Sequence, residues 1–205
     1  QSNASTRSKS AATAWGQAVP LASPIVFSGL LPHVQNAFAS HLSDRGYGIL
    51  IPAVGTGAGG SEAHALQTQF FPGGPIATTL VDGDMKMAGI GTITWVDKDR
   101  FLAFGHPFMG LGKTDIPVSY AKIVTTVASE AGSWKLGRPT QPAGKLTHDR
   151  IFAIGGSTDL KPTLVPLSVT LQGEGFGIVK GTETFNYQLA NHPTDLPVFC
   201  AIVSA

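Results

Sequence analysis

The most informative stretch of the sequence is residues 88–110, which read AGIGTITWVDKDRFLAFGHPFMG. Met87–Val96 and Arg100–Phe104 are rich in the β-branched, aromatic and other apolar residues that favour strands. The charged residues 97–99 between them predict a turn. The stretch therefore predicts a hairpin whose return strand ends at a glycine corner that presents His106.

A histidine at the end of a strand is well placed to act as a general base. Such a base has to be held rigidly and still be open to solvent and substrate, and a strand end beside a glycine bend meets both needs. Trypsin-like proteases place their catalytic histidine in the same local context. The alternative is a histidine that only completes the corner, and the residues alone leave both interpretations open for His106.

The rest of the chain also predicts mainly strands. Besides the hairpin, the strand candidates are Ile76–Val81, Pro117–Val127, Arg150–Ile154, Leu164–Leu171 and Thr182–Leu189. Near the N-terminus, apolar residues at three- and four-residue steps predict a helix over 31–45, with short strands at 24–27 and 47–52 on either side. We expect a mainly β fold with an N-terminal β-α-β addition and no second long helix.

A weak internal repeat links two parts of the chain. Gly91–Thr94 leads through a turn to Asp99–His106, and Gly144–Thr147 leads through a shorter turn to Asp149–Gly156. Each copy predicts a hairpin whose return strand ends in a glycine-bounded bend, although only the first copy ends in a histidine. Both duplication and chance explain such a likeness in a glycine-rich β protein. Duplication would suit two similar barrels.

The composition excludes several classes of protein. Of the 205 residues, 42% are hydrophobic and 13% are charged, with a net charge of +1. These values argue against a disordered chain and against a strongly basic nucleic-acid binder. No apolar run approaches the roughly 18 residues of a membrane-spanning helix. The single cysteine, Cys200, excludes an internal disulfide, and the six histidines show no metal-binding spacing, so we expect neither a metal nor another cofactor.

Several motifs together resemble the SpoIVB-type S55 serine peptidases, in particular the bacterial SpoIVB peptidase S55 domain-containing proteins. These motifs are Gly89–Thr94, Ala103–His106, and residues 72–75, 105–108, 115–117, 133–137 and 146–150. The resemblance covers about residues 24–197. It implies a trypsin-like double β-barrel, serine endopeptidase action on a protein partner, and an extracytoplasmic location, periplasmic or secreted. It also implies that His106 is the general base.

The nucleophile and the acid are harder to place. The family's serine lies in a Gly-x-Ser-Gly-Ser-Pro motif, which is absent from this chain. Ser61 and Ser157 each follow a pair of glycines and are the candidate nucleophiles. Asp115 and Asp149 are the candidate partners of His106, because a carboxylate bonded to a histidine fixes its tautomer and raises its pKa. Structural roles compete in each case: loop or strand hydroxyls for the serines, a turn cap for Asp115, and an ion pair with the following arginine for Asp149.

Two functions from different classes fit these observations. One is an S55-like serine endopeptidase, and the other is a catalytically silent peptide- or protein-binding domain that lacks the nucleophilic serine. Strand-addition binding needs only an exposed sheet edge and side-chain pockets. A third interpretation is a fragment of a larger enzyme. We expect residues 1–19 to be a tag remnant and a flexible arm, and residues 20–205 to be a single domain that continues past Ala205.

Overall fold

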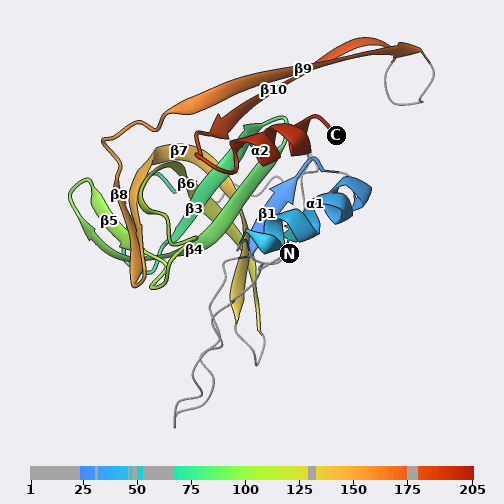
Figure 1. Cartoon of the computed structure of the whole chain (residues 1–205). Helices are drawn as coiled ribbons and strands as arrows, with labels where there is room; N and C mark the ends of the chain where they lie inside the picture. The colour runs from blue at the N-terminus through green and yellow to red at the C-terminus, as the bar shows by residue number, and fades with distance from the viewer. Residues whose placement is uncertain are drawn as a thin grey trace, which may run out of the picture.

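The computed structural model describes residues 24–30, 32–45, 47, 50–52, 67–128, 133–174 and 180–205. These residues form ten strands and two helices. Figure 1 shows their arrangement. In chain order they are β1 (Ile25–Ser28), α1 (Pro32–Asp44), β2 (Leu50–Pro52), β3 (Pro75–Gly83), β4 (Lys86–Asp97), β5 (Arg100–Ala103), β6 (Gly112–Val127), β7 (Trp134–Arg150), β8 (Ala153–Ser157), β9 (Leu164–Glu174), β10 (Lys180–Ala190) and α2 (Leu196–Val203). The prediction of a mainly β fold is confirmed.

Six of the strands close into a ring in the order β3-β4-β5-β8-β7-β6. The ring closes because β3 pairs with β4 along one edge and with β6 along the other. Every neighbouring pair in the ring is antiparallel. β1 and β2 extend the sheet from β4, and β10 and β9 extend it from β3. The described strands form one ring, so the repeated hairpins do not each build a barrel.

The two hairpins of the internal repeat lie side by side in this ring. β5 of the first copy pairs with β8 of the second, and Phe101 lies opposite Gly156. The first turn lies where it was predicted, because Asp97 pairs with Arg100, but the second does not: Arg150 pairs with Ala153, so this turn falls at residues 151–152. The predicted strand over 150–154 is therefore wrong. Arg150 ends β7, and β8 starts after the turn.

The core fills the inside of the ring. Each ring strand contributes at least one large side chain that is at most 2% exposed: Ile76, Ile93, Phe101, Ile116, Leu146 and Ile154. Burial of one such side chain stabilises a fold by about 1.5–3 kcal/mol. Phe70 closes one mouth of the ring, with its ring centroid 5.1 Å from that of Phe101 and 5.0 Å from that of Tyr120.

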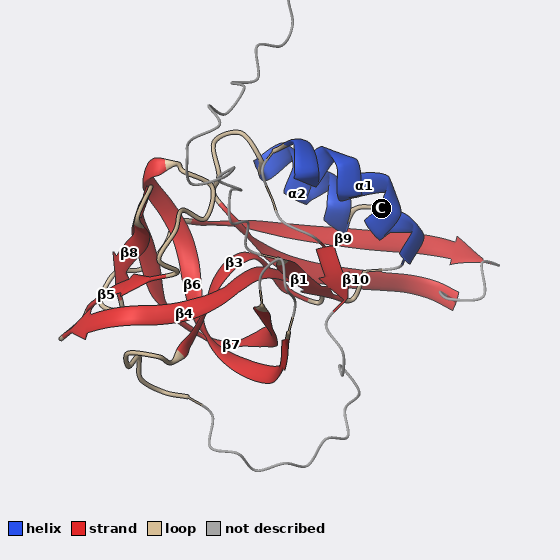
Figure 2. Ribbon diagram, turned by 90° about the horizontal axis from the view of Figure 1, so that it is seen from below, coloured by secondary structure: helices blue, strands red, loops and turns tan. Residues whose placement is uncertain are grey.

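The N-terminal addition is confirmed. β1 and β2 are parallel, as a β-α-β unit requires, and α1 connects them. The predicted residues 48 and 49 lie outside the described residues. The second helix, α2, was not predicted, because the apolar run at its C-terminal half reads equally well as a strand. α2 buries Phe199 and Ile202, and its start lies against the end of α1 through the ion pair between Arg45 and Asp195 (Figure 2).

The longest strand, β7, was largely missed from the sequence because prolines interrupt it. Pro139 pairs with Ala121 and Pro142 pairs with Ser119, and the register with β6 shifts between these pairs. Such bulges let a strand carry proline, which cannot donate to the ladder. At the other end of the sheet, β9 and β10 form a long ribbon that reaches beyond the ring (Figure 1). Neither described helix is long and apolar enough to cross a membrane.

Candidate functional site

The predicted glycine corner is present directly after β5. Phe104 and Gly105 both have left-handed backbones, with φ of 72° and 74°. A positive φ is rare for a bulky residue and costs of order 1–3 kcal/mol, so the surrounding structure has to impose it. Here the Phe104 N–H donates to the carbonyl oxygen of Thr92 on β4 at 2.9 Å. The bend turns the chain sharply out of the ring and presents His106.

The two glycines of β4 make room for the aromatic residues on either side of His106. A Cβ added at Gly91 would overlap the ring of Phe104, and one added at Gly89 would lie 2.6 Å from the ring of Phe108. The rings of Phe104 and Phe108 meet edge to face, with centroids 6.0 Å apart. Gly89 and Gly91 are therefore glycines because each lies directly beneath one of these two aromatic rings.

The imidazole of His106 has the tautomer that a general base needs. Its Nδ1 lies 2.8 Å from the carbonyl oxygen of Pro107. A carbonyl oxygen can only accept, so Nδ1 carries the hydrogen and the neutral ring keeps its lone pair on Nε2. The ring of Phe104 supports the other side, with centroids 5.5 Å apart. His106 is half-buried, and no described residue bonds to its Nε2.

Asp149 holds the loop that follows His106. Its carboxylate is buried and accepts the backbone N–H of Phe108 at 2.8 Å, of Met109 at 2.8 Å and of Leu111 at 3.2 Å. The expected alternatives do not occur. Asp149 makes no ion pair with the arginine that follows it and no hydrogen bond with the His106 ring. Its role at the corner is to accept hydrogen bonds from several backbone amides, and the sequence alone does not predict this role.

The other predicted site residues lie away from His106. Asp115 accepts from the backbone N–H of Thr163 at 3.2 Å, from its hydroxyl at 2.9 Å, and from Lys145 at 3.1 Å. These contacts fasten β6 and β7 to the segment before β9. Ser61 lies outside the described residues.

Ser157 takes part in a different contact. Its hydroxyl donates to the carboxylate of Asp99 at 2.6 Å and accepts from the Asp159 N–H at 3.1 Å. This hydrogen bond is the main reason why the pKa of Asp99 lies below its usual value. Ser157 lies opposite Arg100 at the start of β5, whereas His106 follows the end of that strand, so the structure does not bring the two together.

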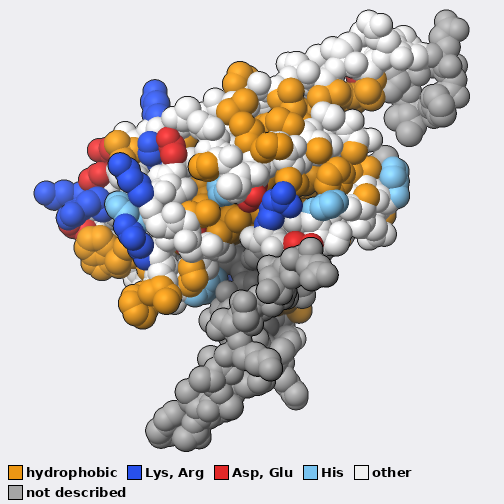
Figure 3. Space-filling view, in the orientation of Figure 1, with side chains coloured by type: hydrophobic (Ala, Val, Ile, Leu, Met, Phe, Trp, Pro, Cys, Tyr) orange, Lys and Arg blue, Asp and Glu red, His pale blue; other side chains and the backbone are white. Residues whose placement is uncertain are grey.

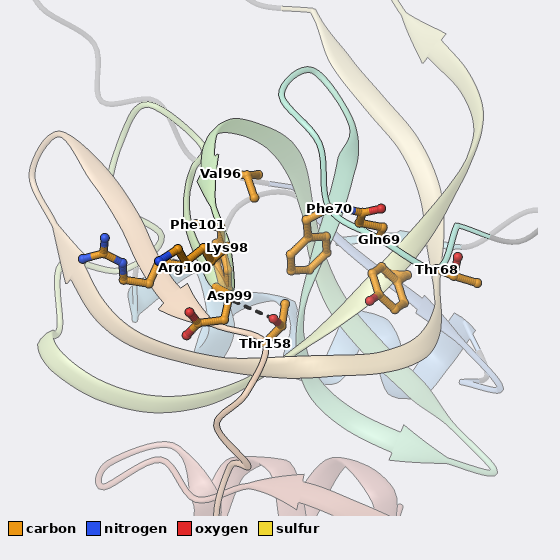
Figure 4. Close-up of a pocket in the computed structure, with 10 residues that line it drawn as sticks. Thr68, Gln69, Phe70, Val96, Lys98, Asp99, Arg100, Phe101 and Thr158 are labelled. Atoms are coloured by element: carbon orange, nitrogen blue, oxygen red, sulfur yellow. Dashed lines mark hydrogen bonds between the residues drawn. The ribbon is translucent and has the colours of Figure 1, made fainter.

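Two cavities of the described structure lie elsewhere on the ring. One, of about 220 Å³, lies at the mouth that Phe70 closes, as Figure 4 shows. Phe101 and Arg100 of β5 both line it, but the Arg100 side chain extends away from Phe70 (Figure 4). The alternating exposure along β5 explains this difference, because successive side chains of a strand point to opposite faces.

A larger groove, of about 650 Å³, lies on the outer face over β5 and β8. Most of its surface is apolar, and it is lined by Trp95, Leu102, His148, Arg150, Phe152 and Leu160, among others. Figure 3 shows Lys and Arg side chains gathered around a histidine at this end of the molecule, with hydrophobic side chains beside them. The sequence shows the apolar residues of this groove, but it does not show which face of the sheet they lie on.

A third cluster of polar residues is buried between the helices. Asp195 accepts from the Tyr47 hydroxyl at 2.6 Å and pairs with Arg45 at 3.1 Å. Burial, with a contribution from Asp195, raises the pKa of Tyr47 far above its usual value, so Tyr47 stays a donor. His192 accepts the Asp195 N–H at 3.1 Å, and burial lowers the pKa of this histidine, although Asp195 opposes the shift. This network joins α1 to α2 and was not predicted.

No family model, no curated protein and no solved structure matches the chain.

Proposed function

We propose that this chain is an S55-like domain that binds a protein or peptide in the outer groove over β5 and β8. The observation that carries the proposal is the groove itself, whose volume of about 650 Å³ falls in the usual range for ligand sites of about 300–1,000 Å³. Large apolar side chains stand open in it: Trp95 is 43% exposed, Leu102 44% and Phe152 82%. Contiguous exposed apolar surface of this kind marks interaction sites.

The polar residues of the chain support binding better than hydrolysis. A serine peptidase needs a nucleophile, a base and an acid in hydrogen-bonded order. Among the described residues, Ser157 bonds to Asp99, and Asp149 bonds to backbone amides. No serine or threonine hydroxyl among the described residues forms a hydrogen bond with His106.

The test is peptide capture. The whole chain is panned against a phage-displayed library of short random peptides, and the selected peptides are then measured by fluorescence anisotropy. We expect Leu102→Asp to abolish capture, because it places a charge in the apolar lining. Val124→Asp is the matched control, since Val124 is 52% exposed on β6 and does not line the groove. Equal loss in both variants, or none in Leu102→Asp, would refute binding at this surface.

A second candidate is S55-type serine endopeptidase activity on a protein partner, with His106 as general base in a trypsin-like arrangement. Its support is the tautomer of His106, whose Nδ1 hydrogen bonds to Pro107 and leaves Nε2 free to take a proton. A fluorophosphonate probe, read by intact mass, decides between the two. Labelling that is lost in His106→Ala would favour the peptidase. Absence of labelling in both proteins is the result that the binding proposal predicts.

A further inference from the structure

We infer that the groove takes an extended segment of a partner protein that sets one bulky apolar side chain over Gly155 and a carboxylate against Arg150. This inference rests on the proposed function and specifies the chemistry of the partner.

The hollow for the apolar side chain comes from a glycine in a row of outward-facing residues. Across four neighbouring strands, Trp95 pairs with Leu102, Leu102 with Gly155, and Gly155 with His148. Directly opposite residues in antiparallel strands lie on the same face of a sheet. Three members of this row project side chains outward, whereas Gly155 projects none. A shallow hollow therefore lies over Gly155, between Leu102 and His148, and the Leu102 side chain covers part of it.

The side chains around this hollow are suited to contact an apolar side chain of the partner. The Leu102 side chain leans over the glycine, because a Cβ added at Gly155 would lie 3.0 Å from its terminal carbon. Phe152 and Leu160 line the same groove and are 82% and 46% exposed. Each of these side chains would lose exposed apolar area on binding, which favours the bound state.

The charge at one end of the groove suits a carboxylate. Arg150 ends β7 beside the groove, and the described residues offer it no ion pair or hydrogen bond. The row also continues on that side from His148 to Lys113 of β6, which is equally unpaired in the described part of the chain. An exposed guanidinium is a fork-shaped donor that matches a carboxylate.

The acidic residues of the groove lie at its other end. Asp99 is already engaged by Ser157, and Asp159 follows β8 at the end opposite Arg150. Arg100 lies at this end too, where it pairs with Asp97 at 2.6 Å and stacks 6.0 Å from the Trp95 ring. Of the two arginines that line the groove, Arg150 is therefore the one without a described partner, and the two ends of the groove differ in charge.

The experiment compares peptides selected from the random library by the parent chain and by Arg150→Glu. We expect the parent to select peptides with Asp or Glu next to a bulky apolar residue, and Arg150→Glu to weaken these peptides about fivefold and to select Lys or Arg instead. Gly155→Val, which fills the hollow, should abolish the apolar preference. Arg138→Glu is the matched control, because Arg138 is exposed on β7 and does not line the groove.

The outcomes separate the inference from the proposed function. The inference would be overturned if peptides bind in a way that depends on Leu102 but contain no preferred acidic residue, or bind Arg150→Glu as tightly as the parent chain. Either result would leave the binding function standing. Absence of any peptide that needs Leu102 would overturn both. Binding of vesicles made of phosphatidylserine and phosphatidylcholine that depends on Arg150, without peptide binding, would assign the groove to a membrane surface and also overturn the inference.

Discussion

The carboxylate of Asp149, at the end of β7, accepts the backbone N–H of Phe108, 41 residues earlier in the chain, at 2.8 Å. This contact ties the second hairpin of the ring to the loop that presents His106 in the first. A carboxylate that accepts several amide hydrogens is a strong, charge-assisted capping group. The position of the histidine thus depends on a residue from the other half of the ring.

Asp149→Asn should loosen this loop. The amide nitrogen of asparagine cannot accept from a backbone N–H, so at least one buried donor loses its partner, at a cost of about 1–3 kcal/mol. We expect a lower free energy of unfolding in urea and faster hydrogen exchange of the amides of residues 108–111. Asp115→Asn is the control, because the hydrogen bonds of Asp115 to Thr163 are exposed and their loss should cost less than about 1 kcal/mol. Similar losses in both variants would contradict the role of Asp149.

Gly91→Ala should disturb the corner through Phe104. The added methyl group would overlap the Phe104 ring, and the resulting crowding should destabilise the fold by about 1–3 kcal/mol. Thermal unfolding measures the loss. Gly173→Ala is the matched control in β9, since a Cβ there meets nothing within 4 Å. If Gly91→Ala is as stable as the control, the glycine is not needed to seat the aromatic ring.

The stability of the protein should fall in mild acid because of His192. Burial lowers the pKa of His192 below the ordinary histidine value of about 6.5, so the unfolded chain binds a proton more readily than the folded one. Stability should therefore be constant above a pH of about 6.5 and decline as the pH falls below it, until the folded-state pKa is reached. Urea unfolding across this range measures the slope.

His192→Asn supplies the control for this prediction. The asparagine side-chain oxygen can accept from the Asp195 N–H as the imidazole does, but it does not titrate. The decline in stability below about pH 6.5 should be shallower in this variant. An unchanged slope would show that other groups cause the pH dependence.

Ser157→Ala should raise the pKa of the Asp99 carboxyl toward its usual value. The Ser157 hydroxyl is the largest single cause of the lowered pKa, and alanine removes it. A carbon-13 NMR titration of the Asp99 carboxyl measures the change. Thr158→Ala should leave this pKa in place, because the Thr158 hydroxyl donates to the Asp99 backbone carbonyl instead. Equal shifts in both variants would contradict the assignment.

Local patterns were sufficient to predict most elements of this fold. The strand class, the helix over Pro32–Asp44 and the hairpin around residues 97–99 follow from spacing and turn residues, which act over a few positions. The long strand β7 was missed because its prolines argue against a strand. The second helix was missed because a short apolar run is compatible with either a strand or a helix. The bulges that admit proline depend on the register with β6, which no single segment encodes.

The sequence by itself determined that His106 stands at a glycine corner and that two glycines precede it on the neighbouring strand. Only the tertiary structure decided what surrounds that corner and the groove. Ring closure pairs β5 with β8, so that Asp149 reaches the loop after His106 and Gly155 lies opposite Leu102 in the groove. These contacts join residues that are tens of positions apart, and their energy exists only once the strands are in register around a common core.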